Sequence, residues 1–471
     1  MKSVQASRTC RWLAFSSVII ATVGVTYFYG GFAKLRVGPL FMLDALFCFF
    51  AAVVVATRDF PPMSYLMKVL LTPLVFFSWG ILLFSHDLVF GFESLRADSR
   101  TPLRFVQHAI LFVYPFLWMS VGAWVAWLGR PWTKTLVIAL LVANALPNPF
   151  RTDGRQWGVI NFSLGPLLVL PLLVLIEDML SSKSKWQARL KKAVLALAVA
   201  LMAFSSFWVL WHLKEMQRST LLLCLVMVVL GPWILAKFRP QAKPLRTMLI
   251  ALSFLIAGFL VITLSQPHAT TAESFGREKF SGKLSNQFFE AMQKKEDIPY
   301  EGNPQSFQMR SRKFWWKTAL ADWKLNPILG IGFIPEIPSF LEEDMPNSWE
   351  SVANFPRLRS ASPVAGPHNS YLSILARMGV VGLVLFSLIP AFWVLRIKRI
   401  LKPPQGNESG SLDILIRLAL VFVPINGMVY AFFNVGFESP QNCVLLWLFA
   451  GMGLGWAYQY ERGSKKQGSL L

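Results

Sequence analysis

The chain has 471 residues, of which 54% are hydrophobic and only 15% are charged. A soluble protein of this size carries about 25% charged residues, so the composition excludes an ordinary soluble enzyme. The net charge of +21 would suit a nucleic-acid-binding protein, but the basic residues lie in short segments between apolar runs. These runs, each about 20 residues long, indicate an all-α polytopic membrane protein.

Twelve apolar runs are candidates for membrane-spanning helices. A transmembrane β-barrel is not indicated, because barrel strands alternate apolar with polar residues. The first run follows Lys2, Arg8 and Arg11 and has no small-residue cleavage site behind it, so it is interpreted as a membrane helix rather than a signal peptide. The predicted spans are 12–29, 39–56, 65–85, 103–127, 132–146, 158–179, 192–213, 219–236, 246–266, 371–395, 412–433 and 441–459.

The distribution of Lys and Arg predicts the orientation, because basic loops stay in the cytoplasm. With a cytoplasmic N-terminus, the cytoplasmic segments are rich in basic residues, as in 183–192 and 396–402, whereas the outer segment 434–440 has none. Both termini are therefore expected in the cytoplasm. The predicted organisation is membrane helices over 1–266, an external loop domain over 267–370, membrane helices over 371–459 and a cytoplasmic tail over 460–471.

The long external loop carries a helix signal of its own. Met309–Leu325 places Trp and Phe at three- and four-residue spacing with basic residues between them, which predicts an amphipathic helix at the membrane interface. Asn326-Pro327 should end this helix, and Gly330-Ile331-Gly332 should turn the chain. The acidic run Glu342–Asp344 is better explained by a solvated loop than by a cation site, since no second carboxylate cluster stands near it in sequence.

Histidines and arginines mark the outer side of the membrane. All five histidines fall at or near that side, as an external surface site would require. His368 opens the tenth span and is either a functional group or an anchor at the helix end. Arg218, in the short turn before the eighth span, is either a ligand or an arginine that snorkels to the headgroups. Arg312, judged alone, is better interpreted as a solvated charge than as a ligand.

Nucleotide-binding and zinc-protease motifs are missing from the sequence. There is no GxxxxGK[ST], no HExxH and no GxSxG, so neither an ATPase nor a cytosolic nucleotide-sugar transferase is indicated. The cysteines form no CxxC and none lies in the long loop, which predicts neither a disulfide framework nor a metal site.

Three segments and their layout point to one family. They are Pro367-His368-Asn369-Ser370-Tyr371 with Leu375–Gly382, Arg312 before Trp316 and Asn326–Gly332, and Gln217-Arg218-Ser219 at the eighth span. Together with a long external loop between the ninth and tenth of twelve spans, they resemble the bacterial O-antigen ligase/polymerase family of membrane glycan transferases.

The resemblance implies a GT-C-like glycosyltransferase that acts at the periplasmic face of the bacterial inner membrane. It would transfer glycan from an undecaprenyl-diphosphate-linked donor to a sugar hydroxyl, with inversion and without metal, nucleotide or cofactor. His368 would be the general base, and Arg218 and Arg312 would hold the diphosphate. Asn369 and Trp316 would line the substrate site. The expected reaction is O-antigen ligation to lipid A–core, and the alternative is polymerisation onto another lipid-linked glycan.

The implied chemistry is physically sound. A sugar hydroxyl is a poor nucleophile, and a positioned base accelerates its attack by about 10²–10⁴-fold. The departing diphosphate gains negative charge, which a guanidinium can grip with two hydrogen bonds. A secondary transporter or flippase also fits twelve spans, but no internal repeat is found, and Asp44 and Glu177 are the acidic residues clearly in or near the spans. A non-enzymatic membrane scaffold is the third class considered.

Overall fold

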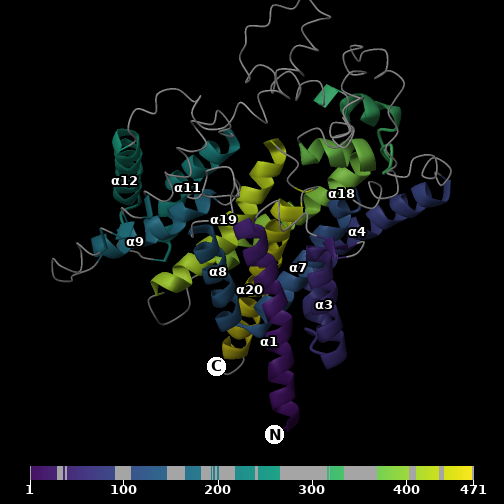
Figure 1. The fold of residues 1–471 in the computed structure, drawn as a ribbon, viewed down its shortest axis with the longest axis horizontal. Helices are drawn as coiled ribbons and strands as arrows, with labels where there is room; N and C mark the ends of the chain where they lie inside the picture. The colour runs from purple at the N-terminus through teal and green to yellow at the C-terminus, as the bar shows by residue number, and fades with distance from the viewer. Residues whose placement is uncertain are drawn as a thin grey trace, which may run out of the picture. The chain divides into compact units, whose positions relative to one another are not determined.

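The structure is a computed structural model, and nearly all of the residues that it describes are helical (Figure 1). They are residues 2–28, 36–37, 40–90, 108–145, 165–181, 192–193, 195–196, 199–200, 218–238, 242–265, 316–317, 319–333, 369–402, 410–433, 437 and 440–468.

Long helices follow one another along the chain, with one small hairpin near the N-terminus. In the hairpin, β1 (Arg36–Val37) pairs antiparallel with β2 (Leu40–Phe41). The helices are α1 (Lys2–Val23) with its π-helical continuation η1 (Gly24–Phe28), α3 (Met42–Thr57), α4 (Met63–Phe90), α7 (Ile110–Leu128), α8 (Arg130–Ala145), the 3₁₀ turn η2 (Gly165–Leu168), α9 (Val169–Ser181), α11 (Arg218–Ala236), α12 (Pro244–Ser265), α18 (Ser370–Ile400), α19 (Ser411–Phe433) and α20 (Pro440–Gly468).

The prediction of an all-α polytopic membrane protein is confirmed. Within the described residues, five helices are long and apolar enough to cross a membrane, judged by length and composition. The full set of twelve spans stays a prediction, since only fragments of 192–213 are described. The five are Arg8–Thr26, Met63–Phe90, Ile110–Leu128, Ser370–Ile400 and Ser411–Phe432.

Two helices extend beyond their expected ends. Helix α4 continues past residue 85 to Phe90, so His86 lies inside a helix rather than after it. Helix α20 continues to Gly468, so most of the expected tail is helical. Both extensions contain polar residues. A helix predicted from its apolar run therefore ends before them, although the backbone hydrogen bonds of the helix continue.

The chain divides into two compact units. The first, which we call the helical unit, comprises Met1–Ile81, Ile110–Ile262 and Val384–Leu471. The second, which we call the loop unit, comprises Leu82–Ala109 and Thr263–Leu383. Helices α4 and α18 each contribute residues to both units, because the dividing points fall within them.

The core of the helical unit is built on the contact between α7 and α20. Their backbones approach closely at glycines: a Cβ on Gly122 would lie 2.0 Å from the carbonyl oxygen of Leu448. A Cβ on Gly451 would lie 2.2 Å from the carbonyl oxygen of Met119. Small residues at such crossings allow the tight van der Waals packing that holds helices together in lipid. Alanine at either glycine would therefore force the two helices apart.

Buried charge in the helical unit is paired with backbone carbonyls. Arg417 in α19 is 1% exposed. Its Nη1 donates to the carbonyl oxygens of Ile400 and Lys402, each at 2.7 Å. These carbonyls close α18, where the last turn of a helix leaves acceptors without partners. Arg417 thus satisfies the C-terminus of α18 and anchors it to α19.

Candidate active site

The structure describes some of the predicted site residues and not others. The side chains of Asn369 and Trp316 are described, and Arg218 is placed by its backbone as the first residue of α11, at the expected start of the eighth span. His368, Arg312 and the acidic run lie outside the described residues.

Asn369 caps the N-terminus of α18. Its side-chain Oδ1 accepts hydrogen bonds from the backbone N–H groups of Tyr371 (3.0 Å) and Leu372 (3.2 Å). Its carbonyl oxygen accepts from the N–H of Ser373 at 3.1 Å. The first N–H groups of a helix have no intrahelical acceptor, and Asn is among the best residues to supply one. The cap fixes the backbone of Asn369, the residue that follows His368 in the sequence. Contact between Asn369 and the substrate stays a prediction.

Asn369→Ala is expected to destabilise the start of α18 by about 1 kcal/mol, because two N–H groups lose their acceptor. Asn369→Asp keeps an acceptor oxygen in place and is the matched control. Thermal unfolding of the purified variants in detergent measures the difference. If the alanine variant unfolds at the same temperature as the aspartate variant, the cap contributes no stability.

Helix α18 is interrupted at Gly379, where the backbone takes φ 65° and ψ −169°. The interruption leaves backbone N–H and carbonyl groups of α18 on either side of Gly379 without partners in the helix. A turn from another part of the chain forms hydrogen bonds with these groups. We call this segment, Asn326–Phe333, the docked turn. Its four backbone hydrogen bonds with α18 are Ile331 N to Ala376 O (2.9 Å), Gly332 N to Arg377 O (3.0 Å), Val380 N to Pro327 O (2.9 Å) and Val381 N to Ile328 O (3.3 Å).

Glycines make this approach possible. Gly330, Gly332 and Gly379 all have positive φ, which side chains disfavour. A Cβ on Gly330 would lie 2.3 Å from the carbonyl carbon of Arg377, and one on Gly379 would lie 2.0 Å from the carbonyl oxygen of Ile328. Two segments that carry the family resemblance, Asn326–Gly332 and Leu375–Gly382, are thus brought into direct contact.

The helix in front of the docked turn ends as predicted. Residues 319–325 are helical, and the helix stops at Asn326-Pro327. Asn326 closes it by accepting from the N–H of Gly330 at its carbonyl oxygen (2.8 Å) and from the N–H of Leu329 at its side chain (3.3 Å). The turn at Gly330-Ile331-Gly332 is also confirmed. The part of the predicted helix before Trp316 lies outside the described residues.

Four ionisable side chains gather around the docked turn, and we call them the charge cluster: Asp87, His108, Asp322 and Arg377. Arg377 is 7% exposed. It donates from Nη1 to the carbonyl oxygen of Gly332 (3.3 Å), and its Nη2 lies 3.2 Å from Nε2 of His108. A guanidinium only donates, so His108 accepts at Nε2 in this hydrogen bond. Asp87 accepts from the N–H of Phe333.

Asp322 is the member of this cluster whose pKa is raised. It is 7% exposed, and within the described residues its Oδ1 has no hydrogen-bond partner. Burial raises the pKa of the Asp322 carboxyl from 3.8 to about 6, against the opposing effect of the Arg377 guanidinium. The cluster was not predicted from the sequence, although an arginine inside the apolar run of α18 was a usable signal, because charges within membrane segments are costly and usually paired.

The raised pKa of Asp322 predicts a pH-dependent stability. Between its unfolded value and about pH 6 the folded state binds more protons than the unfolded state, so the free energy of unfolding falls as pH rises from about 4 to about 6. Asp322→Asn stays neutral and should lose this dependence. Thermal unfolding in detergent across that range tests it, with Asp413→Asn in α19 as control. An unchanged pH slope in Asp322→Asn would contradict the assignment.

The helices and the glycine-dependent docking define the class of this protein: an all-α, multi-pass membrane protein with a turn bonded to a broken membrane helix. Residues 215–387 match the protein family described as O-antigen ligase. Over this range, which is less than half of the chain, the protein is similar to the O-antigen ligase family. No curated protein matches this chain.

The matched range contains every predicted site residue, together with α11, α12, the docked turn and the first half of α18. The family comprises ligases and polymerases of polysaccharide and lipopolysaccharide assembly, and it implies lipid-linked glycan substrates. The resemblance inferred from short sequence motifs is thereby confirmed at the level of the family.

Proposed function

We propose that this protein transfers a glycan from an undecaprenyl-diphosphate carrier to a sugar hydroxyl at the periplasmic face of the inner membrane. The reaction we favour is ligation of O-antigen to lipid A–core. The family match over 215–387, which includes all candidate residues, carries the proposal. The capped start of α18 supports it, since the residue that follows His368 in the sequence has a fixed backbone.

In the proposed reaction His368 is the general base. It takes the proton of the acceptor hydroxyl, whose oxygen attacks the anomeric carbon of the donor sugar. A new C–O bond forms as the bond to the diphosphate oxygen breaks, so the configuration at that carbon inverts. The hydrogen bonds of Asn369 fix the first turn of α18, and fixed geometry beside a reacting group lowers the entropy cost of an attack.

Arg218 and Arg312 are the proposed holders of the leaving diphosphate. The diphosphate gains negative charge as the bond breaks, and a guanidinium keeps its own charge at any relevant pH. Trp316 supports a role in substrate binding: its indole Nε1 is buried and, within the described part of the chain, has no acceptor. A buried donor of this kind normally finds a partner, and a glycan hydroxyl is a suitable one.

Arg218→Lys separates charge from geometry. Lysine keeps the positive charge and can still reach the headgroups, but it cannot make two parallel hydrogen bonds to a diphosphate. We expect a loss on the order of 2–4 kcal/mol of transition-state stabilisation at unchanged protein level. The transfer rate of the purified variant measures it. A rate within a few-fold of the parent would remove Arg218 from the active site.

A reconstituted transfer assay tests the function itself. The purified protein, in the presence of EDTA, is given lipid-linked O-antigen and either lipid A–core or a second lipid-linked glycan. Product on lipid A–core supports the ligase, and product only on the lipid-linked glycan supports the polymerase alternative. Absence of transfer to both acceptors, with the protein folded, would contradict the proposal, and activity that returns only with added Mg²⁺ would contradict the metal-free mechanism.

The transporter alternative depends on acidic residues within the spans, and both candidates have structural partners. The hydroxyl of Tyr114 donates to Asp44 at 2.7 Å, and the hydroxyl of Thr247 donates to Glu177 at 2.8 Å. These hydrogen bonds join α7 to α3 and α12 to α9, which gives each carboxyl a role in helix packing. We therefore place the glycan transferase ahead of a transporter or flippase.

A further inference from the structure

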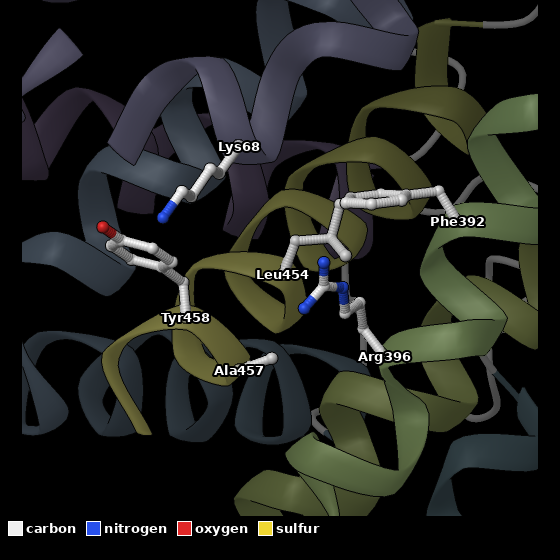
Figure 2. A pocket seen from close by; sticks show the side chains of 6 residues that line it. All are labelled: Lys68, Phe392, Arg396, Leu454, Ala457 and Tyr458. Carbon is white, nitrogen blue, oxygen red and sulfur yellow. The ribbon is translucent and has the colours of Figure 1, made fainter. Parts of the chain in front are cut away.

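A small, open pocket lies among α4, α18 and α20 in the helical unit (Figure 2). It is distinct from the proposed transfer site, because its α18 residues lie near the C-terminal end of that helix whereas Asn369 caps the opposite end. Its lining residues are Lys68 from α4, Phe392 and Arg396 from α18, and Leu454, Ala457 and Tyr458 from α20.

The polar character of the pocket is cationic. Figure 2 shows the Lys68 ammonium and the Arg396 guanidinium projecting into the space between the helices. Lys68 Nζ lies 4.8 Å from the ring centroid of Tyr458, and Arg396 Cζ lies 5.0 Å from that of Phe392. The aromatic faces hold both cations in place. Among the described residues none of those that line the pocket is acidic, so its charge favours an anion.

The helices place this pocket at a boundary between apolar and polar surroundings. Lys68 lies in the second turn of α4, and the last turn of α18 carries Lys398 and Arg399 just beyond Arg396. Large apolar side chains next to the two cations are exposed, as lipid-facing residues are. They are Met67 (43% exposed), Leu71 (52%), Val394 (55%) and Leu395 (74%).

We propose that this pocket binds the phosphate of an anionic phospholipid. A lysine and an arginine at headgroup level attract a phosphate, and the arginine can bind it with two hydrogen bonds. The exposed apolar residues beside them offer a surface for the acyl chains. A soluble phosphate has no acyl chains and would not cover this surface. The excess of basic residues at this end of α18 places the pocket in the cytoplasmic leaflet.

Native mass spectrometry of the full-length protein tests the site. The protein is equilibrated with equal amounts of phosphatidylglycerol and phosphatidylcholine, and the lipid that stays bound is identified. We expect the parent to retain phosphatidylglycerol and the Lys68→Gln/Arg396→Gln variant to lose about tenfold of that preference. Lys134→Gln/Lys398→Gln removes the same charge from two exposed positions that do not line the pocket, and it should behave as the parent does.

Two further measurements distinguish a bound phospholipid from a bound soluble phosphate and from a change in the fold. Millimolar inorganic phosphate should not displace the bound phosphatidylglycerol, and displacement would overturn the lipid assignment in favour of a soluble phosphate. Lys68→Gln alone alters an exposed side chain and should keep the fold while lowering the preference about threefold. Equal retention of phosphatidylglycerol by the pocket variants and by the control double variant would overturn the proposal.

Discussion

His368→Ala is expected to reduce glycan transfer by about 10²–10⁴-fold, the usual contribution of a positioned general base. The acceptor hydroxyl keeps its proton without such a base, so the attack on the anomeric carbon slows while donor binding through the arginines is retained. Transfer rate per molecule of purified protein is the measurement, with donor binding recorded in parallel.

A second histidine provides the control for this substitution. His86 lies in α4 with 63% of its side chain exposed, and His86→Ala should leave the transfer rate close to that of the parent. If His368 only anchors the start of α18, His368→Ala would lower the amount of folded protein, and the molecules that fold would transfer at the parental rate. That outcome would remove the general base from the mechanism.

Gly379→Ala is expected to release the docked turn from α18. The positive φ costs a residue other than glycine about 1–2 kcal/mol, and the added methyl group would lie 2.0 Å from the carbonyl oxygen of Ile328. This overlap is with backbone that cannot rotate away, and forcing a methyl group into packed structure costs about 1–3 kcal/mol or more. The total, on the order of 4 kcal/mol, is exceptional for one substitution.

Hydrogen exchange reports this release directly. The amides of Ile331 and Gly332 are bonded to α18, and their exchange should accelerate roughly a thousandfold in Gly379→Ala, because each 1.4 kcal/mol corresponds to a factor of ten. Gly410→Ala is the matched control, since no atom of the described residues lies within 4 Å of its added Cβ. Unchanged protection of both amides in Gly379→Ala would show that the turn does not depend on the glycine.

The fold class followed from the sequence because membrane helices are encoded locally. A continuous apolar run is sufficient to predict a spanning helix, and α7 and α19 fall where such runs lie. The end of the loop helix at Asn326-Pro327 was likewise predictable, as proline removes a backbone donor. Helix ends with polar residues, such as the last turns of α4, carry no apolar signal and were placed too early.

The arrangement around the docked turn could not be predicted in the same way. Its four hydrogen bonds join backbone groups, which leave no trace in residue type apart from the glycines that permit them. The charge cluster joins residues as distant in sequence as Asp87 and Arg377, and no sequence motif marks Asp322 as a member. In the folded protein the Asp322 carboxyl is buried and interacts with Arg377 of α18. The roles of His368, Arg312 and Arg218 stay predictions.

The position of the docked turn in the chain has a consequence for how this protein is made. A membrane helix with an interruption would present bare amide groups to lipid, which offers them no hydrogen bonds. Residues 326–333 are synthesised before α18, so their carbonyl and N–H groups already exist when the ribosome produces Gly379. The interrupted helix therefore enters the bilayer with its hydrogen-bond partners already translated, and biogenesis of α18 does not have to wait for any later part of the chain.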